Sequence, residues 1–250
     1  MTPASDAFQI MLRKLDMRAR IDEADREALL ALPYRQQAHE PSVYIVREGQ
    51  RPERSCLILS GFAVRHKLTI EGARQIVSVH IPGDFVDLES ALLNFADHNV
   101  QTLTRCELAF IPRVALRELI LARPRVAAAM WIDTLIDSSI FREWVVNVGR
   151  RDARARIAHL LCEFPRRLEV AGLAEEYRYE LPMTQEQIAD ATGLTSVHVN
   201  RVLMALSREG LIERDKRLVR IPDWERLRRV AGFSALYLHL DQTPPLPRPA

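Results

Sequence analysis

The chain has 250 residues, of which 48% are hydrophobic and 27% charged, and its formal net charge is +2. A chain of this length and composition buries one ordinary core or two smaller ones, which excludes an intrinsically disordered protein. No apolar run approaches the roughly 18 residues of a membrane span, and the N-terminus lacks the segments of a signal peptide, so we expect a soluble cytoplasmic protein. Cys56, Cys106 and Cys162 lack disulfide or zinc spacing and are expected to be structural thiols.

The first forty residues carry apolar side chains at mostly helical spacing, so we expect short helices that cap the next part of the chain. From Ser42 to about Ile111 the pattern changes to short β-rich runs, which are VYIV, CLILSGFAV, IVSVHI and LAFI. Turn signals with glycine or proline-glycine separate these runs. Short strands at such spacing indicate a small barrel, sandwich or roll.

A long helix is predicted next. The stretch 114–148 is rich in Ala, Leu, Arg and Glu, and Pro124 marks a break or the first turn of a new helix. From Arg125 to Val148 one helix would run about 36 Å at 1.5 Å per residue. Its heptad positions are apolar with a small polar middle, which indicates either packing on its own domain or a dimer seam whose polar centre fixes the register. These positions are Ala127, Trp131, Thr134, Ser138, Phe141, Val145 and Val148.

A helix-turn-helix is predicted after an amphipathic helix that we expect to end near Pro165. Ala189 is the small residue that lets the two helices approach, and Gly193 permits the positive φ of the turn. Thr184 and Thr195 are N-cap candidates, the first with a glutamine at the capping-box position. The expected core consists of Ile188, Leu194, Val199, Val202 and Leu203.

A winged helix is indicated by the segments REG, LIER and RLVRI, which predict a helix end and two strands joined by a polar turn. Either basic stretch, 150–156 or 208–220, could on its own be a solvated face, but basic residues at a wing tip would meet DNA phosphates. Arg201 is the main candidate for a bidentate contact with guanine, an ion pair with Glu209 or Glu213 being the alternative. Asn200 would read adenine or contact a phosphate. The predicted DNA-binding residues are Thr184, Gln185, Thr195, Ser196, Val197, His198, Asn200, Arg201, Lys216 and Arg217.

The order of these parts resembles the CRP/FNR family of bacterial transcription regulators over residues 42–223. LPMTQEQIADATGLTSVHVNRVLMALSREGLI carries the match in the DNA-binding part, and LSGFAV, IPGDFVDLE and LAFIPR carry it in the roll. The resemblance implies an α+β fold that begins with a double-stranded β-helix, or jelly roll, similar to cyclic-nucleotide-binding (cNMP-binding) domains, over residues 1–124. A dimerisation helix (125–149), a winged helix-turn-helix domain (150–232) and a C-terminal tail (233–250) would come after it.

The same resemblance implies a homodimer that binds palindromic double-stranded DNA, RNA polymerase as a partner, and an effector in or near the roll. The dimer would join along the long helix through Trp131, Thr134, Ser138, Phe141, Val145 and Val148.

Departures from the family bear on the effector. Cyclic-nucleotide-binding members carry an arginine-serine pair where this chain has His98-Asn99. Without that arginine the pocket lacks a bidentate phosphate partner, so cyclic AMP is not expected. No cysteine precedes Cys56, so an iron–sulfur cluster is not expected either; haem is left open, and no metal site is predicted. The candidate effector-pocket residues are Asp87, Glu89, His98 and Asn99.

The recognition helix also departs from the family. Many relatives have glutamate at the position of Val197 and serine or glycine at that of Asn200, whereas Arg201 matches. A missing glutamate removes an acceptor for cytosine, so we expect an operator that differs from the common family sequence.

Two other functions compete with a gated regulator. A cupin-like metalloenzyme would use the histidines of the roll, but these lack the His-x-His spacing that places two imidazoles on one strand face, so we predict that the protein is not an enzyme. The other is a constitutive DNA-binding dimer whose roll has lost ligand binding. If binding is gated, we expect the dimer helix and its junction at 148–150 to reposition the recognition helices. The histidines and acid considered for a metal are His39, His66, His80, His98 and Glu89.

Overall fold

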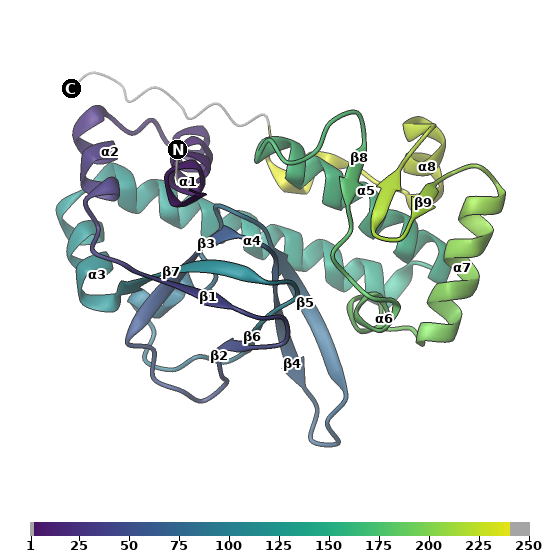
Figure 1. Ribbon diagram of the computed structural model, residues 1–250, viewed down its shortest axis with the longest axis horizontal. Coiled ribbons are helices and arrows are strands. Elements are labelled where there is room, and N and C mark those ends of the chain that lie inside the picture. The colour runs from purple at the N-terminus through teal and green to yellow at the C-terminus, as the bar shows by residue number, and fades with distance from the viewer. Residues whose placement is uncertain (1–2, 241–250) are drawn as a thin grey trace. The chain divides into compact units, whose positions relative to one another are not determined.

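The structure is a computed structural model that describes residues 3–240, with side chains from Phe8 onward (Figure 1). Internal contacts divide the chain into two compact units. Among the described residues, the first comprises 3–63, 80–138 and 239–240, and the second comprises 64–79 and 139–238. The boundaries expected at 124 and 149 fall near the two ends of one helix, Pro124–Arg150. Within the described residues, no helix is long and apolar enough to cross a membrane.

The first unit begins with helix α1 (Pro3–Arg18) and helix α2 (Glu23–Leu30). Asp22 caps α2 in a reciprocal capping box with Asp25, which satisfies backbone groups that the first helical turn leaves without partners. The apolar side of α1 packs on the roll, in agreement with the cap expected from the sequence.

The turn at Gly83 and Asp84 of the roll packs closely against α1 and is bonded to it. Gly83 has φ +84°, and a Cβ atom there would lie 2.5 Å from Cγ2 of Ile10, so both the backbone conformation and the close approach require glycine. Lys14 of α1 donates to the neighbouring Asp84 carboxylate, and Asp84 also accepts a hydrogen bond from the Ile81 amide at 3.0 Å. The Pro-Gly-Asp turn predicted from the sequence is therefore an anchoring point for the N-terminal helix.

Short strands form the roll, in two sheets of order β1-β7-β3 and β2-β6-β4-β5 among the described residues (Figure 1). Strands β1 and β3 both pair antiparallel with β7. The 3-10 helix η1 (Leu88–Ala91) and helix α3 (Arg113–Ala122) complete this part of the chain. The strands are β1 (Arg35–His39), β2 (Tyr44–Val46), β3 (Arg54–Ser60), β4 (Ala63–Leu68), β5 (Arg74–His80), β6 (Asn99–Thr102) and β7 (Cys106–Pro112).

Strand β3 is buried on both faces, which explains its continuous apolar run. Cys56 and Ile58 belong to the core cluster inside the roll, whereas Leu57 and Leu59 belong to the cluster that contains the helices. Strand β1 escaped prediction because its residues, RQQAH, are polar and mostly exposed, and its place in the sheet depends on backbone pairing with β7.

Helix α4 (Pro124–Arg150) is the predicted long helix. Pro124 stands at its first position, where the missing N–H costs no intrahelical hydrogen bond. The 27-residue helix is continuous and contributes to both units.

Helix α5 (Ala153–Val170) passes through Pro165, so the expected end near this proline is wrong. In a regular helix the amide of residue 165 would donate to the carbonyl of Leu161, and proline has no such donor. The hydroxyl of Tyr179 donates to Leu161 O at 2.9 Å instead, and both groups are buried. A side chain distant in sequence thus supplies the hydrogen bond that proline removes.

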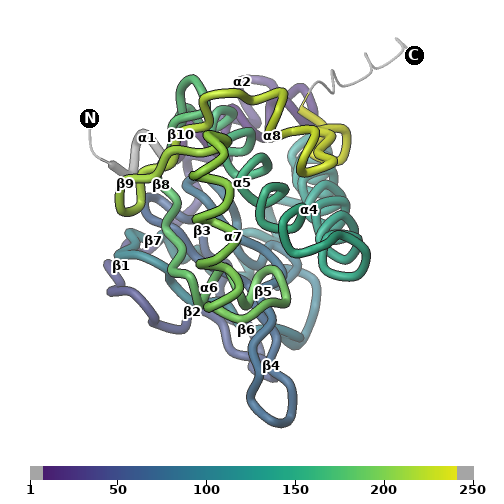
Figure 2. The backbone as a smooth tube through the Cα atoms, turned by 90° about the vertical axis from the view of Figure 1, so that its right-hand side faces the viewer, coloured from purple at the N-terminus to yellow at the C-terminus, as the bar shows by residue number. Residues whose placement is uncertain are grey.

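The winged helix-turn-helix follows α5 within the second unit, and its helices α6 and α7 pack together (Figure 2). Within the segment 233–250 that we expected to form the C-terminal tail, Phe233 and Leu238 are buried. The proline-rich segment 241–250, expected to be disordered, lies outside the described residues. The elements are β8 (Arg178–Glu180), α6 (Gln185–Thr192), α7 (Ser196–Arg208), β9 (Glu213–Asp215), β10 (Leu218–Arg220), α8 (Trp224–Ala231) and η2 (Ala235–Leu238).

Replacing Tyr179 by phenylalanine is expected to lower the free energy of unfolding by about 1–3 kcal/mol, because it leaves the buried Leu161 carbonyl without a donor. Denaturant unfolding of the purified protein measures this loss. Tyr177→Phe is the matched control, since the Tyr177 ring stacks on Trp224 and its hydroxyl has no hydrogen-bond partner among the described residues. Equal effects of the two variants would contradict the role given to the Tyr179 hydroxyl.

Candidate nucleic-acid interface

Both helices of the helix-turn-helix begin at threonine caps. Thr184 Oγ1 accepts from the Gln187 amide at 3.2 Å, and Gln187 Oε1 accepts from the Thr184 amide at 2.8 Å, which is the predicted capping box. Thr195 Oγ1 accepts from the His198 amide at 3.3 Å. The hydroxyls of both threonines are therefore used to start α6 and α7.

The turn between the helices has the predicted geometry. Gly193 ends α6 in the left-handed conformation, with φ +65°, and a Cβ atom there would lie 3.1 Å from Val148 Cγ1. Ala189 is buried at the position where the helices approach. Val199 and Leu203 are buried on the inner face of α7, so the opposite face of this helix is left at the surface.

The outer face of α7 lines a concave surface that encloses a volume of about 460 Å³. Val197 and Met204 are apolar but 69% and 58% exposed. Together with Asn200 and Arg201 they follow the i, i+3, i+4, i+7 spacing of one helix face. The full lining is Gln185, Ser196, Val197, Asn200, Arg201, Met204 and Arg208.

Arg201 is exposed and has no hydrogen-bond or ion-pair partner within residues 3–240. The acids considered as its partners are engaged elsewhere. Glu209 pairs with Arg154 at 2.5 Å, and Glu213 pairs with Arg220 at 3.0 Å. The guanidinium of Arg201 is therefore available at the surface of α7.

Asn200 is joined to the first helix of the motif. Its Nδ2 donates to Oε1 of Gln185 at 3.1 Å, across the two helices. Gln185 is the first residue of α6, so the bond links the start of one helix to the middle of the exposed face of the other. Sequence analysis placed both residues in the interface but gave no sign of this contact, since they are 15 positions apart.

The wing is a small three-stranded sheet of order β8-β10-β9. Leu218 pairs with Asp215, so Lys216 and Arg217 form a two-residue turn, and Lys216 has φ +53°. Both side chains are exposed at this tip, where Arg217 lies 3.9 Å from Glu180. The basic tip predicted from the sequence is thus present in the second unit.

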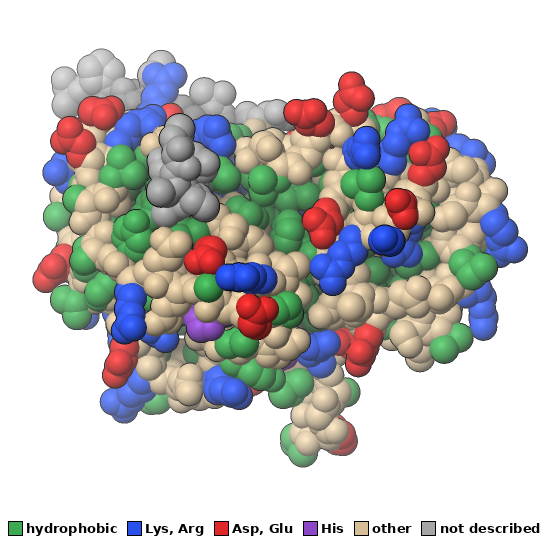
Figure 3. Space-filling model, in the orientation of Figure 1, with side chains coloured by type: hydrophobic (Ala, Val, Ile, Leu, Met, Phe, Trp, Pro, Cys, Tyr) green, Lys and Arg blue, Asp and Glu red, His purple; other side chains and the backbone are tan. Residues whose placement is uncertain are grey.

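Charged side chains of both signs are interspersed over the face drawn in Figure 3, whereas over α7, at its right-hand edge, the coloured side chains are basic or apolar. Three of the four arginines in the run 150–156, namely Arg151, Arg154 and Arg156, have structural partners. Arg151 pairs with Glu143 at 2.5 Å, and Arg156 donates to the carbonyl of Thr192 at 3.1 Å. These arginines hold the end of α4 and the end of α6 in the second unit.

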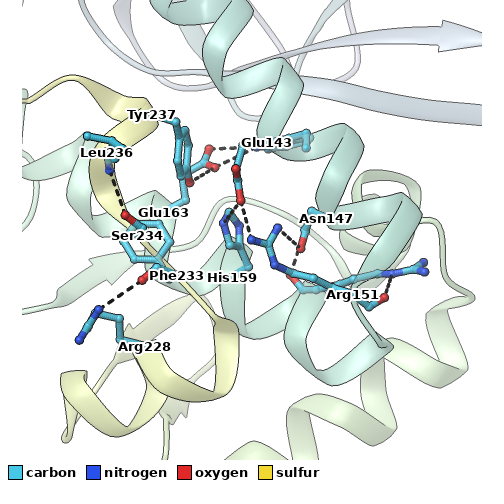
Figure 4. Close-up of polar contacts among 12 residues, drawn as sticks. Glu143, Asn147, Arg151, His159, Glu163, Arg228, Phe233, Ser234, Leu236 and Tyr237 are labelled. Atoms are coloured by element: carbon cyan, nitrogen blue, oxygen red, sulfur yellow. Dashed lines mark hydrogen bonds and ion pairs between the residues drawn. The ribbon is translucent and has the colours of Figure 1, made fainter.

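A buried polar cluster joins the end of α4 to α5 and to η2 (Figure 4). Glu163 is 2% exposed, and its carboxylate accepts from Trp144 Nε1 at 3.0 and 3.1 Å and from the Tyr237 hydroxyl at 2.7 Å. Burial raises the pKa of Glu163, and the nearby Arg167 opposes this effect. We call Glu143, Trp144, His159, Glu163 and Tyr237 the joint cluster.

His159 is the fully buried histidine of the joint cluster. Its Nε2 lies 3.3 Å from Glu143 Oε1, and its ring stacks on that of Tyr237 at 5.8 Å. Burial, assisted by the charge of Arg151, lowers the pKa of His159 from 6.5 to about 3. The imidazole is therefore neutral at neutral pH, and its Nε2 edge faces the Glu143 carboxylate (Figure 4).

The face of α4 proposed for dimerisation is largely at the surface. Trp131, Phe141 and Val145 are 65%, 47% and 56% exposed, and Thr134 and Ser138 are exposed between them. Leu135 adds a further exposed apolar side chain. Val148 differs from these residues because it is half-buried and faces Gly193 of the helix-turn-helix.

The four candidate effector residues take part in contacts of the roll. Asp87 is buried, and its Oδ1 accepts from Ser55 Oγ and from the Cys56 amide at 3.2 Å. His98 is also buried; its Nδ1 lies 2.7 Å from Asp97 Oδ1, and its Nε2 lies 3.7 Å from Glu89 Oε1. Asn99 Oδ1 accepts from the amide of Glu48 at 3.1 Å. Of the four, the structure brings His98 and Glu89 together.

The histidines considered for a metalloenzyme do not converge. Within the part of the chain that the structure describes, no group of three His, Cys, Asp or Glu side chains is arranged to hold a metal ion. Cys56, Cys106 and Cys162 are free and buried, and burial raises the pKa of each thiol.

Comparison with known proteins agrees with this architecture. Residues 36–123 match the cyclic nucleotide-binding domain, and residues 155–230 match the Crp-like helix-turn-helix domain. The chain is 29% identical over 218 residues to the transcriptional activator protein FnrL of Cereibacter sphaeroides, covering 86% of this chain and 87% of FnrL. It is 32% identical over 156 residues to the nitrogen fixation regulation protein FixK of Bradyrhizobium diazoefficiens, covering 62% and 64%.

Among solved structures, FixK2 from Bradyrhizobium japonicum is similar, with a TM-score of 0.75 and 25% identity over 82% of this chain and 100% of that chain. Fold and interface together define a class of regulator in which a cNMP-binding-like roll precedes a long helix and a winged helix-turn-helix. The chain belongs to the CRP/FNR family of transcription regulators. FnrL and FixK are regulators rather than enzymes.

Because burial lowers the pKa of His159, we predict that the stability of the protein falls in acid. Because the unfolded chain binds a proton near pH 6.5 and the folded chain only near pH 3, the free energy of unfolding decreases as pH falls through this window. The slope is up to about 1.4 kcal/mol per pH unit. Glu163, whose pKa is raised, contributes a slope of opposite sign, so comparison with a variant is needed.

In His159→Gln we expect the acid-dependent loss due to this side chain to disappear. Denaturant unfolding of both proteins between pH about 8 and about 4 measures the difference in their free energies of unfolding. That difference is expected to be constant near pH 8 and to shift in favour of the variant as the pH falls. A difference that does not depend on pH would show that His159 is not a buried neutral imidazole.

Proposed function

We propose that this protein is a sequence-specific DNA-binding transcription regulator that acts as a homodimer on a palindromic operator in the bacterial cytoplasm. The observation that carries the proposal is the exposed guanidinium of Arg201, which has no partner among the described residues, on the outer face of a capped recognition helix. A helix fits the major groove, and the arginine fork matches the N7 and O6 acceptors of guanine. RNA polymerase is the proposed partner, since a regulator bound beside a promoter acts by recruiting or blocking it.

The exposed stripe of α4 supports the homodimer. Large apolar side chains are exposed along one face of the helix, namely those of Trp131, Leu135, Phe141 and Val145. Two copies of such a helix bury their stripes against each other at heptad spacing, and polar positions in the middle favour one register. A two-fold dimer presents two identical recognition helices, so its operator is a palindrome.

The wing supports non-specific affinity. Lys216 and Arg217 are exposed at the tip of the β9–β10 hairpin, where their charges neutralise phosphates and release counterions. Operator binding is therefore expected to weaken as the salt concentration rises.

We further propose that the regulator does not respond to cyclic AMP. His98 and Asn99 occupy the positions of the arginine-serine pair, and their side chains are buried in contacts with Asp97 and with the Glu48 backbone. Neither supplies the bidentate cation that a cyclic phosphate requires. The regulator is then either gated by another effector or independent of ligand, and operator binding by the purified protein without added ligand separates these two forms.

Arg201→Ala is expected to reduce the preference for operator over random DNA by roughly 5- to 150-fold, which is the discrimination that one bidentate arginine–guanine contact provides. The dimer should stay intact. Gel shift or fluorescence anisotropy with an operator selected from random duplexes measures this ratio. Arg229→Ala, which removes the same charge from an exposed site on α8, is the control and is expected to retain the preference. Retained preference in Arg201→Ala would contradict the assignment of this residue.

Phe141→Asp is expected to convert the dimer to a monomer, because it places a charge in the middle of a seam that must be desolvated. Sedimentation or light scattering gives the mass of the particle. Arg117→Asp, at an exposed position of α3, is the control and should leave the dimer unchanged. A parent protein that is monomeric at all concentrations would refute the homodimer, and a dimeric Phe141→Asp would refute this seam.

A further inference from the structure

We infer that Gln185 is a specificity-determining residue that acts by positioning Asn200, and that the two amides together select adenine in the operator. The inference rests on the proposed function, since it concerns how the recognition helix reads DNA. Its basis is the hydrogen bond from Asn200 Nδ2 to Gln185 Oε1, at 3.1 Å, inside the concave surface of α7.

A free asparagine at a protein surface is a poor reader of bases. Its amide can turn over and exchange the positions of its donor and its acceptor, and it loses rotational freedom when it binds. In this protein Gln185 accepts one of the two hydrogens of Nδ2, so the nitrogen is held on the side of α6. The amide oxygen and the second hydrogen of Nδ2 are then left for an external partner.

The pattern that remains is one acceptor beside one donor. Adenine presents the complementary pair in the major groove, a donor at N6 and an acceptor at N7. Guanine presents two acceptors, O6 and N7, and O6 would oppose the Asn200 oxygen. An Asn200 held by Gln185 therefore favours adenine, whereas Arg201, which carries only donors, favours guanine.

The position of Gln185 is maintained by structure that is independent of DNA. It is the first residue of α6, and the capping box between Thr184 and Gln187 starts this helix. Val197, 69% exposed one helical turn before Asn200, brings an apolar group and no acceptor to the same face. A contact of Asn200 with a phosphate would need no fixed amide orientation, so the Gln185 bond favours base reading.

The test is selection of operators from a library of randomised DNA duplexes by the full-length protein and its variants, read as a base preference at each position. The parent protein is expected to select a palindrome with one strongly preferred adenine in each half-site. Asn200→Ala is expected to lose the preference at this position alone. Gln185→Ala should reduce it by roughly 5- to 100-fold, because the amide is no longer oriented, and should add nothing to Asn200→Ala in the double variant.

Two further variants separate positioning from a general structural effect. Gln185→Glu keeps an acceptor for Asn200 Nδ2, so it should retain the adenine preference while its negative charge lowers affinity for all sequences. Gln187→Ala removes a glutamine of the same helical turn that serves only the cap, and it should lower stability without changing the base preference.

The outcomes distinguish this inference from the proposed function. If the parent protein selects no palindrome, the proposed function fails and the inference fails with it. If the parent selects a palindrome but Gln185→Ala keeps its full adenine preference, only the positioning role fails. If Asn200→Ala weakens binding to all sequences equally, Asn200 contacts a phosphate and the inference is wrong.

Discussion

The second unit depends on burying helix α5 on nearly all sides. Helices α6, α7 and α8 and strand β8 all pack on it, and ten of its residues, consecutive from Ile157 to Pro165 and then Leu168, are buried. A helix surrounded in this way has little water to satisfy its polar groups, so hydrogen bonds to them must come from within the protein. Tyr179 serves the carbonyl freed by Pro165, and Trp144 and Tyr237 serve the Glu163 carboxylate. These partners come from α4, β8 and η2, and they therefore tie the elements around α5 into one body.

The arginines of the second unit serve two roles: some form internal contacts that hold the helices together, and Arg201 remains exposed on the recognition helix. Arg151 and Arg156 face acids or carbonyls inside the unit and hold the ends of α4 and α6. Arg154 forms an ion pair with Glu209, which was considered as an alternative partner of Arg201. The guanidinium of Arg201 therefore stays exposed at the surface. The small net charge of the chain thus conceals a separation between paired arginines that hold the domain together and Arg201, which has no partner among residues 3–240. Affinity for phosphates and selection of bases are expected to come from different parts of the same domain.

The local elements with strong backbone signals were predictable. Thr184, Thr195 and Gly193 act at the predicted positions of the helix-turn-helix, because caps and a left-handed turn depend on residues adjacent in the chain. The strand β1 was not predictable, since its polar residues show no alternation and its hydrogen bonds come from β7. The helical path through Pro165 was missed for the same reason, because the compensating donor, Tyr179, lies 14 residues later in the chain. Val148 illustrates a further limit: its heptad position indicated the seam, and nothing in the sequence indicated that it lies close to Gly193 within the second unit.

The amino-acid sequence by itself determined the order of roll, long helix and winged helix-turn-helix, and it determined which residues form the recognition helix. The reason is that periodicity, glycines and caps act over a few residues. Only the tertiary structure decided which polar side chains are free and which are engaged. Arg201 and Arg154 look equivalent in the sequence, yet Arg154 lies 2.5 Å from Glu209 whereas Arg201 has no partner in the part of the chain that the structure describes. The bond between Asn200 and Gln185 and the burial of His159 and Glu163 also arise between elements. Hydrogen bonds and desolvation depend on distances of a few ångströms in space, and such distances between side chains far apart in the chain are set only when the helices pack.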